Sequence, residues 1–110
     1  MGTITRFSSV KGVTFKNPDG TERQKVLETL KPADQLILKR EKENPFDKSA
    51  IAVYTQEGIH LGYIGKELAK DLSESIDQGI PVRCFVKEIT GGTLKAPTRG
   101  LNILLEADVA

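Results

Sequence analysis

Two phenylalanine side chains stand at predicted turns, where a ring is available to a ligand more often than it is within a strand. Phe15 precedes the turn at residues 17–20, and Phe46 lies inside the turn at residues 44–47. Proteins hold single-stranded nucleic acid with aromatic faces that stack on bases, at about 1–3 kcal/mol per base, and with cations along the backbone. The alternative is that each ring folds back and packs inside the fold. Both rings are therefore candidates for base stacking.

The chain offers little for catalysis. Its single histidine, His60, lies between Ile59 and Leu61 in a predicted hairpin, and no serine or cysteine nucleophile motif accompanies it. We expect His60 to be an exposed residue at a strand edge, not a general base. The acidic residues lack the spacings of a metal-dependent nuclease, and the glycine pair at 91–92 lacks the setting of a phosphate-binding loop. We predict no catalytic residue, no metal site and no cofactor.

Short elements must position the candidate rings. Leu68, Leu72 and Ile76 repeat at helical spacing, and Thr21 with Gln24 has the form of a capping box for an earlier helix. Short strands between Gly and Pro turns favour an all-β barrel with helices over its openings. Strands are predicted at residues 4–15, 36–40, 50–54, 61–64, 82–89 and 101–105, and helices at residues 22–30 and from residue 66 to a cap at residue 79.

Length and composition set further bounds. The 110 residues suffice for one domain with one modest core, spanning residues 1–110. The net charge is only +1, yet residues 1–40 carry eight Lys/Arg and four Asp/Glu, whereas residues 41–82 carry four and eight. A basic face exists if the first forty residues and Lys66 share one side, and a mixed solvated surface is the alternative. Cys84 cannot form an internal disulfide and lies in an apolar run that predicts a buried thiol.

Two central segments carry a resemblance to a known family. Residues 44–54 read NPFDKSAIAVY, and residues 61–69 read LGYIGKELA. They resemble the HIRAN domain, which reads N-P-[YF]-D-x-x-A-I-x-V and later G-[YH]-[ILV]-x-K-E-[LI]-A. Residues 10–15 resemble the opening strand of that family, and residues 35–41 resemble the strand before its central turn. Because four elements match in order and at the right spacing, the chain is identified as a member of the HIRAN family.

The resemblance implies both a function and a site. HIRAN domains occur in eukaryotic translocases that remodel stalled replication forks and as small free-standing bacterial proteins. In the fork remodellers the domain resembles an oligonucleotide-binding (OB) fold and captures the free 3′-OH end of single-stranded DNA. By position, Phe15 and Phe46 match the aromatic residues that hold the terminal bases, and Asp47 matches the acid that accepts the 3′-hydroxyl. Lys66 matches a residue that contacts backbone phosphate, and Tyr63 stands at a neighbouring position where a histidine occurs.

Asp47 and Thr14 bear on whether the residue roles known in the HIRAN family apply to this chain. A carboxylate repels phosphate, so Asp47 fits such a site only where a hydroxyl must be distinguished from a phosphodiester. Its alternative role is local, as the acceptor of backbone N–H groups just downstream in the turn. The two roles can coexist through its two oxygens. Thr14 stands where DNA-binding members carry an arginine, which removes one phosphate contact.

The sequence as a whole predicts a stand-alone, non-catalytic HIRAN-like domain with an OB- or SH3-like barrel of about six strands and two short helices. We expect it to bind single-stranded DNA at a free 3′-OH end, in DNA repair or replication-fork processing. The alternative is a protein-interaction adaptor that recruits a separately encoded nuclease or helicase. No segment approaches the ~18 apolar residues of a membrane span and no charged leader is present, so we expect a soluble, cytoplasmic protein without membrane partners.

Overall fold

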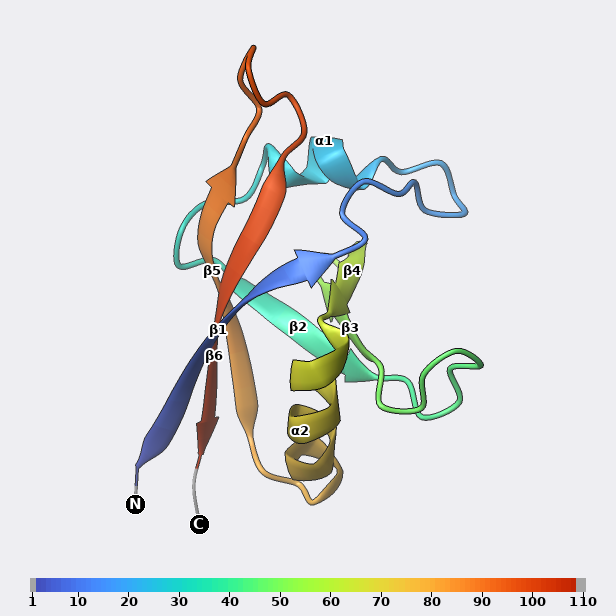
Figure 1. The fold of residues 1–110 in the computed structure, drawn as a ribbon, viewed down its shortest axis with the longest axis vertical. Coiled ribbons are helices and arrows are strands. Elements are labelled where there is room, and N and C mark those ends of the chain that lie inside the picture. The colour runs from blue at the N-terminus through green and yellow to red at the C-terminus, as the bar shows by residue number, and fades with distance from the viewer. Residues whose placement is uncertain (1, 109–110) are drawn as a thin grey trace.

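The computed structural model describes residues 2–108 and shows a closed antiparallel barrel (Figure 1). The strands follow the order β1-β4-β3-β2-β5-β6 around the barrel. The prediction of an all-β barrel with six strands and two helices is confirmed. The strands are β1 (Thr3–Lys11), β2 (Gln35–Arg40), β3 (Ile51–Tyr54), β4 (His60–Ile64), β5 (Val82–Thr90) and β6 (Gly100–Asp108), and the helices are α1 (Arg23–Leu27) and α2 (Lys66–Asp77).

A short seam between β1 and β4 closes the barrel. β1 pairs with β6 along most of its length, but it meets β4 only through the pairs Val10↔Ile64 and Lys11↔Tyr63. Gly62 permits this approach, because a Cβ at this position would overlap the carbonyl oxygen of Lys11. The seam therefore places Lys11 directly beside Tyr63.

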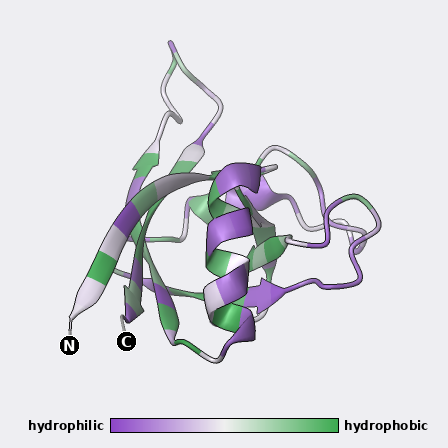
Figure 2. Ribbon diagram, turned by 60° about the horizontal axis from the view of Figure 1, so that its bottom comes forward, coloured by the Kyte–Doolittle hydropathy of each residue, from purple (hydrophilic) through white to green (hydrophobic). Residues whose placement is uncertain are grey.

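The core is formed by inward-facing side chains of the strands and by one face of each helix. Leu72 and Ala69 of α2 pack into this cluster, with Leu68 and Ile76 at its margin, as the helical spacing predicted. Figure 2 shows hydrophobic and hydrophilic residues interleaved along α2 and the strands. The largest fully buried side chains are Leu27, Ile51, Leu61, Leu101, Ile103, Leu105, Val53 and Cys84.

Cys84 is a structural residue, as predicted. It is buried in the core cluster on β5. Burial raises the pKa of its thiol to about 12, which keeps the sulfur protonated near neutral pH.

The first strand and the first helix are both shorter than predicted. β1 ends at Lys11 because Gly12 adopts a φ of 83° and turns the chain, so Phe15 lies in a turn and not in a strand. The N–H of Phe15 donates to the carbonyl oxygen of Gly12 at 3.2 Å and closes that turn. α1 covers only Arg23–Leu27.

The predicted capping box at Thr21 and Gln24 is wrong. The helix begins after Glu22, which makes no side-chain cap hydrogen bond. The Gln24 side chain donates instead to the carbonyl oxygens of Val13, at 3.1 Å, and Arg99, at 2.8 Å. The Gln24 side chain therefore binds partners distant in sequence in place of the backbone at the start of its own helix.

Candidate nucleic-acid interface

A groove of about 370 Å³ lies where the loop between β2 and β3 meets the β1–β4 seam and the start of α2. We call it the Phe46 groove. It brings together four of the six predicted site residues, namely Phe46, Asp47, Tyr63 and Lys66. Its lining consists of Lys11, Asn44, Phe46, Asp47, Ala50, Tyr63, Ile64 and Lys66.

The turn at residues 44–47 holds the Phe46 ring in solvent. Asn44 Oδ1 accepts hydrogen bonds from the backbone N–H groups of Phe46, at 2.8 Å, and Asp47, at 3.0 Å. Pro45 lies between Asn44 and Phe46, and its ring restricts its own φ angle, which further limits the conformations of the turn. The Phe46 side chain is 91% exposed. The alternative in which this ring packs inside the barrel is therefore wrong.

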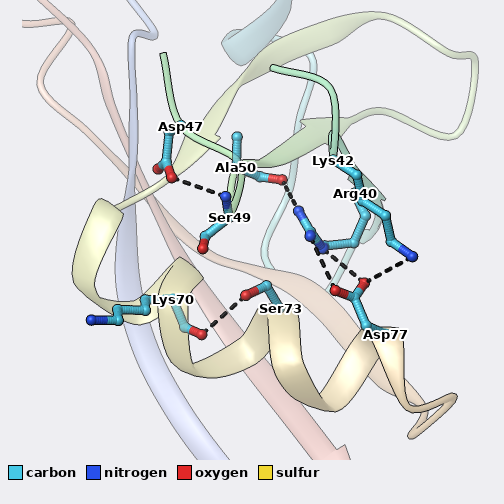
Figure 3. A network of polar contacts seen from close by, with 8 residues as sticks. All are labelled: Arg40, Lys42, Asp47, Ser49, Ala50, Lys70, Ser73 and Asp77. Carbon is cyan, nitrogen blue, oxygen red and sulfur yellow. Dashed lines mark hydrogen bonds and ion pairs between the residues drawn. The ribbon is translucent and has the colours of Figure 1, made fainter. Parts of the chain in front are cut away.

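Asp47 supports the next turn with one of its two carboxylate oxygens. Its Oδ1 accepts the Ser49 N–H at 2.9 Å (Figure 3), and its carbonyl oxygen accepts the Ala50 N–H at 3.1 Å. The predicted turn role is confirmed. Within residues 2–108, Oδ2 accepts no hydrogen bond, so the half-buried carboxylate retains an acceptor for a ligand.

An ion pair fixes the far end of the same loop (Figure 3). The guanidinium of Arg40 contacts the two carboxylate oxygens of Asp77 at 3.0 and 3.1 Å and donates to the Ala50 carbonyl oxygen at 2.9 Å. The hydrogen bonds that the Asp77 carboxylate accepts from Arg40 hold its pKa below the usual value. Through this bidentate ion pair and the bond to Ala50, Arg40 on β2 connects the end of α2 with the residue just before β3. The loop that carries Phe46 is thus anchored at its C-terminal end.

Two lysines give the Phe46 groove a positive balance against Asp47. Lys66 and Lys11 are both exposed, and neither forms an ion pair with a carboxylate in the described part of the chain. Lys11 Nζ donates to Ser9 Oγ at 3.1 Å. The sequence did not single out Lys11, because its place beside Tyr63 comes from the β1–β4 pairing.

Tyr63 forms a wall of the groove with its hydroxyl already engaged. Its OH donates to Glu41 Oε1 at 3.0 Å, and the same oxygen accepts a hydrogen bond from Asn44 Nδ2 at 3.0 Å. Partial burial and the bond to Glu41 raise the pKa of Tyr63, so the phenol stays neutral. Glu41 therefore joins the ring wall to the turn that presents Phe46.

Phe15 and Thr14 lie outside the Phe46 groove. Both are exposed, and the Phe15 ring is 65% exposed, so it does not fill the barrel. A Cβ at Gly12 would lie 3.4 Å from the Phe15 ring, which places the ring against the residue that follows Lys11. The structure therefore does not bring Phe15 into one cavity with Phe46.

His60 differs from its predicted exposed position. It is half-buried, and its ring stacks on the Tyr54 ring at a centroid distance of 4.9 Å. The His60 and Tyr63 rings are nearly perpendicular, at 87°, with their centroids 5.0 Å apart. Both ring nitrogens are engaged, Nδ1 with Arg23 Nη2 at 3.1 Å and Nε2 with the Gly62 carbonyl oxygen at 3.0 Å. Burial, and next the charge of Arg23, lower the pKa of His60. The ring is thus a half-buried member of a polar cluster and not a freely exposed residue.

Across residues 2–108, His, Cys, Asp and Glu side chains form no group of three or more that could hold a metal ion. No helix in this range is long and apolar enough to cross a membrane.

These features define a small closed β-barrel with an aromatic and cationic groove beside one loop. The HIRAN domain family matches residues 10–106, so the chain belongs to the HIRAN domain family. HIRAN domains are known generally as DNA-binding modules and are not themselves catalytic.

Two crystal structures share the fold. The HIRAN domain of human HLTF has a TM-score of 0.70 and 19% identity, with 96% of this chain and 78% of that chain covered. A protein from Lactobacillus plantarum has a TM-score of 0.73 and 24% identity, with 96% and 97% covered. At these identities the likeness concerns the fold alone. No curated protein matches the chain.

Proposed function

We propose that this HIRAN domain binds single-stranded DNA, that it captures a free 3′-OH end, and that it does so without catalysing a reaction. The observation that carries the proposal is the Phe46 ring, 91% exposed on a turn fixed by Asn44, at the rim of a groove that holds two lysines. An exposed ring on a turn whose backbone is already fixed is suited to stack on a base, because the backbone of the turn loses little conformational entropy on binding.

Lys11 and the predicted site residues, inside the Phe46 groove and beside it, each have a proposed role. Phe46 stacks on a terminal base, and Tyr63 forms the wall behind it. Lys66 and Lys11 attract the backbone phosphates. Phe15, beyond Lys11, stacks on a second base, and Thr14 lies beside it without supplying a charge.

Asp47 is proposed to select the end of the strand. Its Oδ1 already accepts the Ser49 N–H, whereas Oδ2 remains an acceptor for a terminal hydroxyl. A phosphate at the 3′ end would place a second anion against this carboxylate and offer no donor in its common ionised form. Discrimination would thus arise from repulsion of the wrong end as well as from a hydrogen bond to the right one.

Fluorescence anisotropy with short oligothymidylates that end in 3′-OH or 3′-phosphate tests this function. We expect binding that weakens as salt rises, with a shallow slope because two lysines are involved. We expect the 3′-OH strand to bind more tightly, by roughly 10- to 150-fold if a charge-assisted bond of about 1.5–3 kcal/mol is lost with the phosphate. Equal affinities would refute end capture and leave general strand binding.

Absence of binding at low salt and high oligonucleotide concentration would refute the DNA function altogether. The domain would then be a protein-interaction adaptor whose barrel surface recruits a separately encoded nuclease or helicase.

We further propose that the domain acts in DNA repair or fork processing, where free 3′ ends arise.

A further inference from the structure

A buried arginine with no acidic partner among residues 2–108 lies between the two aromatic parts of the proposed site. Arg23 is 7% exposed, and its three hydrogen-bond partners are all uncharged acceptors. Nε donates to Asn17 Oδ1 at 2.8 Å, Nη1 to the Gly12 carbonyl oxygen at 2.8 Å, and Nη2 to His60 Nδ1 at 3.1 Å. Because a buried charge is costly unless its hydrogen bonds are made, these three contacts fix the guanidinium in one position.

One end of this contact chain is the turn that presents Phe15. The Gly12 carbonyl oxygen accepts from Arg23 and also from the Phe15 N–H, at 3.2 Å. The Phe15 ring and Arg23 Nη1 both approach the Gly12 Cα, within 3.4 and 3.3 Å of where a Cβ would stand. A shift of the guanidinium would therefore shift the turn and its exposed ring.

The other end is the wall of the Phe46 groove. His60 receives the Arg23 hydrogen bond and packs at right angles to the Tyr63 ring, with centroids 5.0 Å apart. Asn17 completes the cluster, since its Nδ2 donates to the His60 carbonyl oxygen at 3.0 Å while its Oδ1 accepts from Arg23. Contacts thus run without interruption from the Phe15 turn to the groove that contains Phe46.

Because arginine can only donate hydrogen bonds, its contact with His60 determines the tautomer of the imidazole ring. Arginine only donates hydrogen bonds, so Nδ1 must be the bare acceptor nitrogen and Nε2 must carry the proton that Gly62 O accepts. A second proton on the ring would set an N–H and a positive charge against the Arg23 Nη2. That contact would change from attraction to repulsion at 3.1 Å.

We propose that Arg23 and His60 are positioning residues which set the Phe15 turn against the Tyr63 wall, and that tight single-strand binding requires His60 in its uncharged form. This inference rests on the proposed function for its binding half. Arg23 and His60 need not touch the DNA, because they act through Phe15 and Tyr63.

The surroundings of His60 agree with this requirement. The charged or titratable groups around the ring are Arg23 on α1, Tyr54 on β3, Tyr63 on β4 and Glu41 after β2, and Asp19 and Glu57 line the hollow next to it. Burial and the nearby Arg23 hold the His60 pKa below its usual value, despite the opposing effects of the hydrogen bond to the Gly62 carbonyl oxygen and of the Glu41 charge. Protonation is therefore expected only below about pH 6.5, the ordinary pKa of histidine.

NMR of the DNA-free protein tests the positional link, and His60 is the only histidine, so its titration is unambiguous. Between about pH 8 and about pH 5, the ring signals of Phe15 and Tyr63 are expected to shift with the same midpoint as His60. The matched variant is His60→Gln, whose amide can accept from Arg23 but does not titrate in this range. In this variant the Phe15 signals should stay constant. A Phe15 signal that ignores the His60 midpoint in the wild type overturns the link.

Anisotropy with a 3′-OH oligothymidylate over the same pH range tests the binding half, with circular dichroism to establish that the protein remains folded. The wild type should lose roughly two- to tenfold in affinity on acidification, as expected for one lost hydrogen bond. The affinity of His60→Gln, whatever its value at high pH, should not change on acidification, because the amide at this position does not titrate. An equal acid loss in both proteins overturns the binding half. Absence of binding at every pH refutes the proposed function and the binding half with it, whereas the NMR result still decides the positional link.

Discussion

Gln24 and Arg99 are 75 positions apart in the chain and form a reciprocal pair of hydrogen bonds. Gln24 Nε2 donates to the Arg99 carbonyl oxygen at 2.8 Å, and the Arg99 N–H donates to Gln24 Oε1 at 2.7 Å. The amide of one side chain thus pairs with both backbone groups of one residue, as a neighbouring strand would. It joins α1 to the start of β6 at one end of the barrel (Figure 1).

Replacing Gln24 by Ala should lower the free energy of unfolding by about 1–3 kcal/mol, because backbone groups of Arg99 and Val13 lose their partners. Chemical denaturation measures the change. Gln56→Ala is the control, since Gln56 is exposed and makes one hydrogen bond of 3.2 Å, and it should cost less than about 0.5 kcal/mol. Equal losses for the two variants would contradict this assignment.

Phe46→Ala should weaken single-strand binding by roughly 5- to 150-fold, the loss of one stacked base, and leave stability nearly unchanged. Burial supplies little stabilisation to a side chain that is 91% exposed. Phe7→Ala is a matched control, because Phe7 is an exposed ring on β1 that does not line the Phe46 groove. Anisotropy and a thermal melt on both variants separate the effects. A large fall in the melting temperature of Phe46→Ala would mean that the ring supports the fold.

Asp47→Asn should narrow the preference for a 3′-OH end over a 3′-phosphate end. The amide keeps an oxygen for the Ser49 N–H, so the turn should survive, whereas the charge that repels a terminal phosphate is lost. Asp34→Asn is the control, since Asp34 caps another turn by accepting the Lys31 N–H at 2.8 Å, outside the Phe46 groove. Affinities for both oligonucleotides give the result. An unchanged preference in Asp47→Asn would assign this carboxylate to the turn alone.

Stability should fall in acid partly because of His60. Its pKa in the folded protein is lowered by burial and by Arg23, so the unfolded chain binds the proton more readily. The contribution of His60 is thus complete above the unfolded pKa of about 6.5, and it is lost as the pH falls through the folded pKa. Urea unfolding across this range should show a decline in the wild type that is smaller in His60→Gln. Parallel declines would show that other groups cause it.

Cys84 should resist thiol reagents while the barrel is folded. It is 1% exposed, and burial raises its pKa to about 12, so both access and the thiolate fraction are low. A disulfide reagent added to the native protein should react slowly, and denaturant should make the reaction rapid. Rapid labelling of the native protein would mean that β5 opens far more often than a core strand should.

The sequence predicted much of this molecule because local chemistry was decisive at several places. Hydrophobic periodicity located α2 and the strands, and Gly79, with a φ of 84°, follows α2 as predicted. The pattern Asn-Pro-Phe-Asp at residues 44–47 specified a turn, since Pro45 limits φ and short polar side chains bind nearby N–H groups. The exposure of Phe46 follows from that turn.

Other features were decided only by tertiary structure. Lys11 joined the Phe46 groove through strand pairing with Tyr63, and Gln24 left its local cap for Arg99, 75 residues away. His60 became a half-buried member of the polar cluster because Arg23 donates to its ring and the Tyr54 ring stacks on it. Each of these outcomes depends on partners distant in sequence, whose positions are set by barrel closure. Local propensity contains no information about them, so the elements and turns could be derived from the sequence alone, whereas the contacts that assemble the site required the folded barrel.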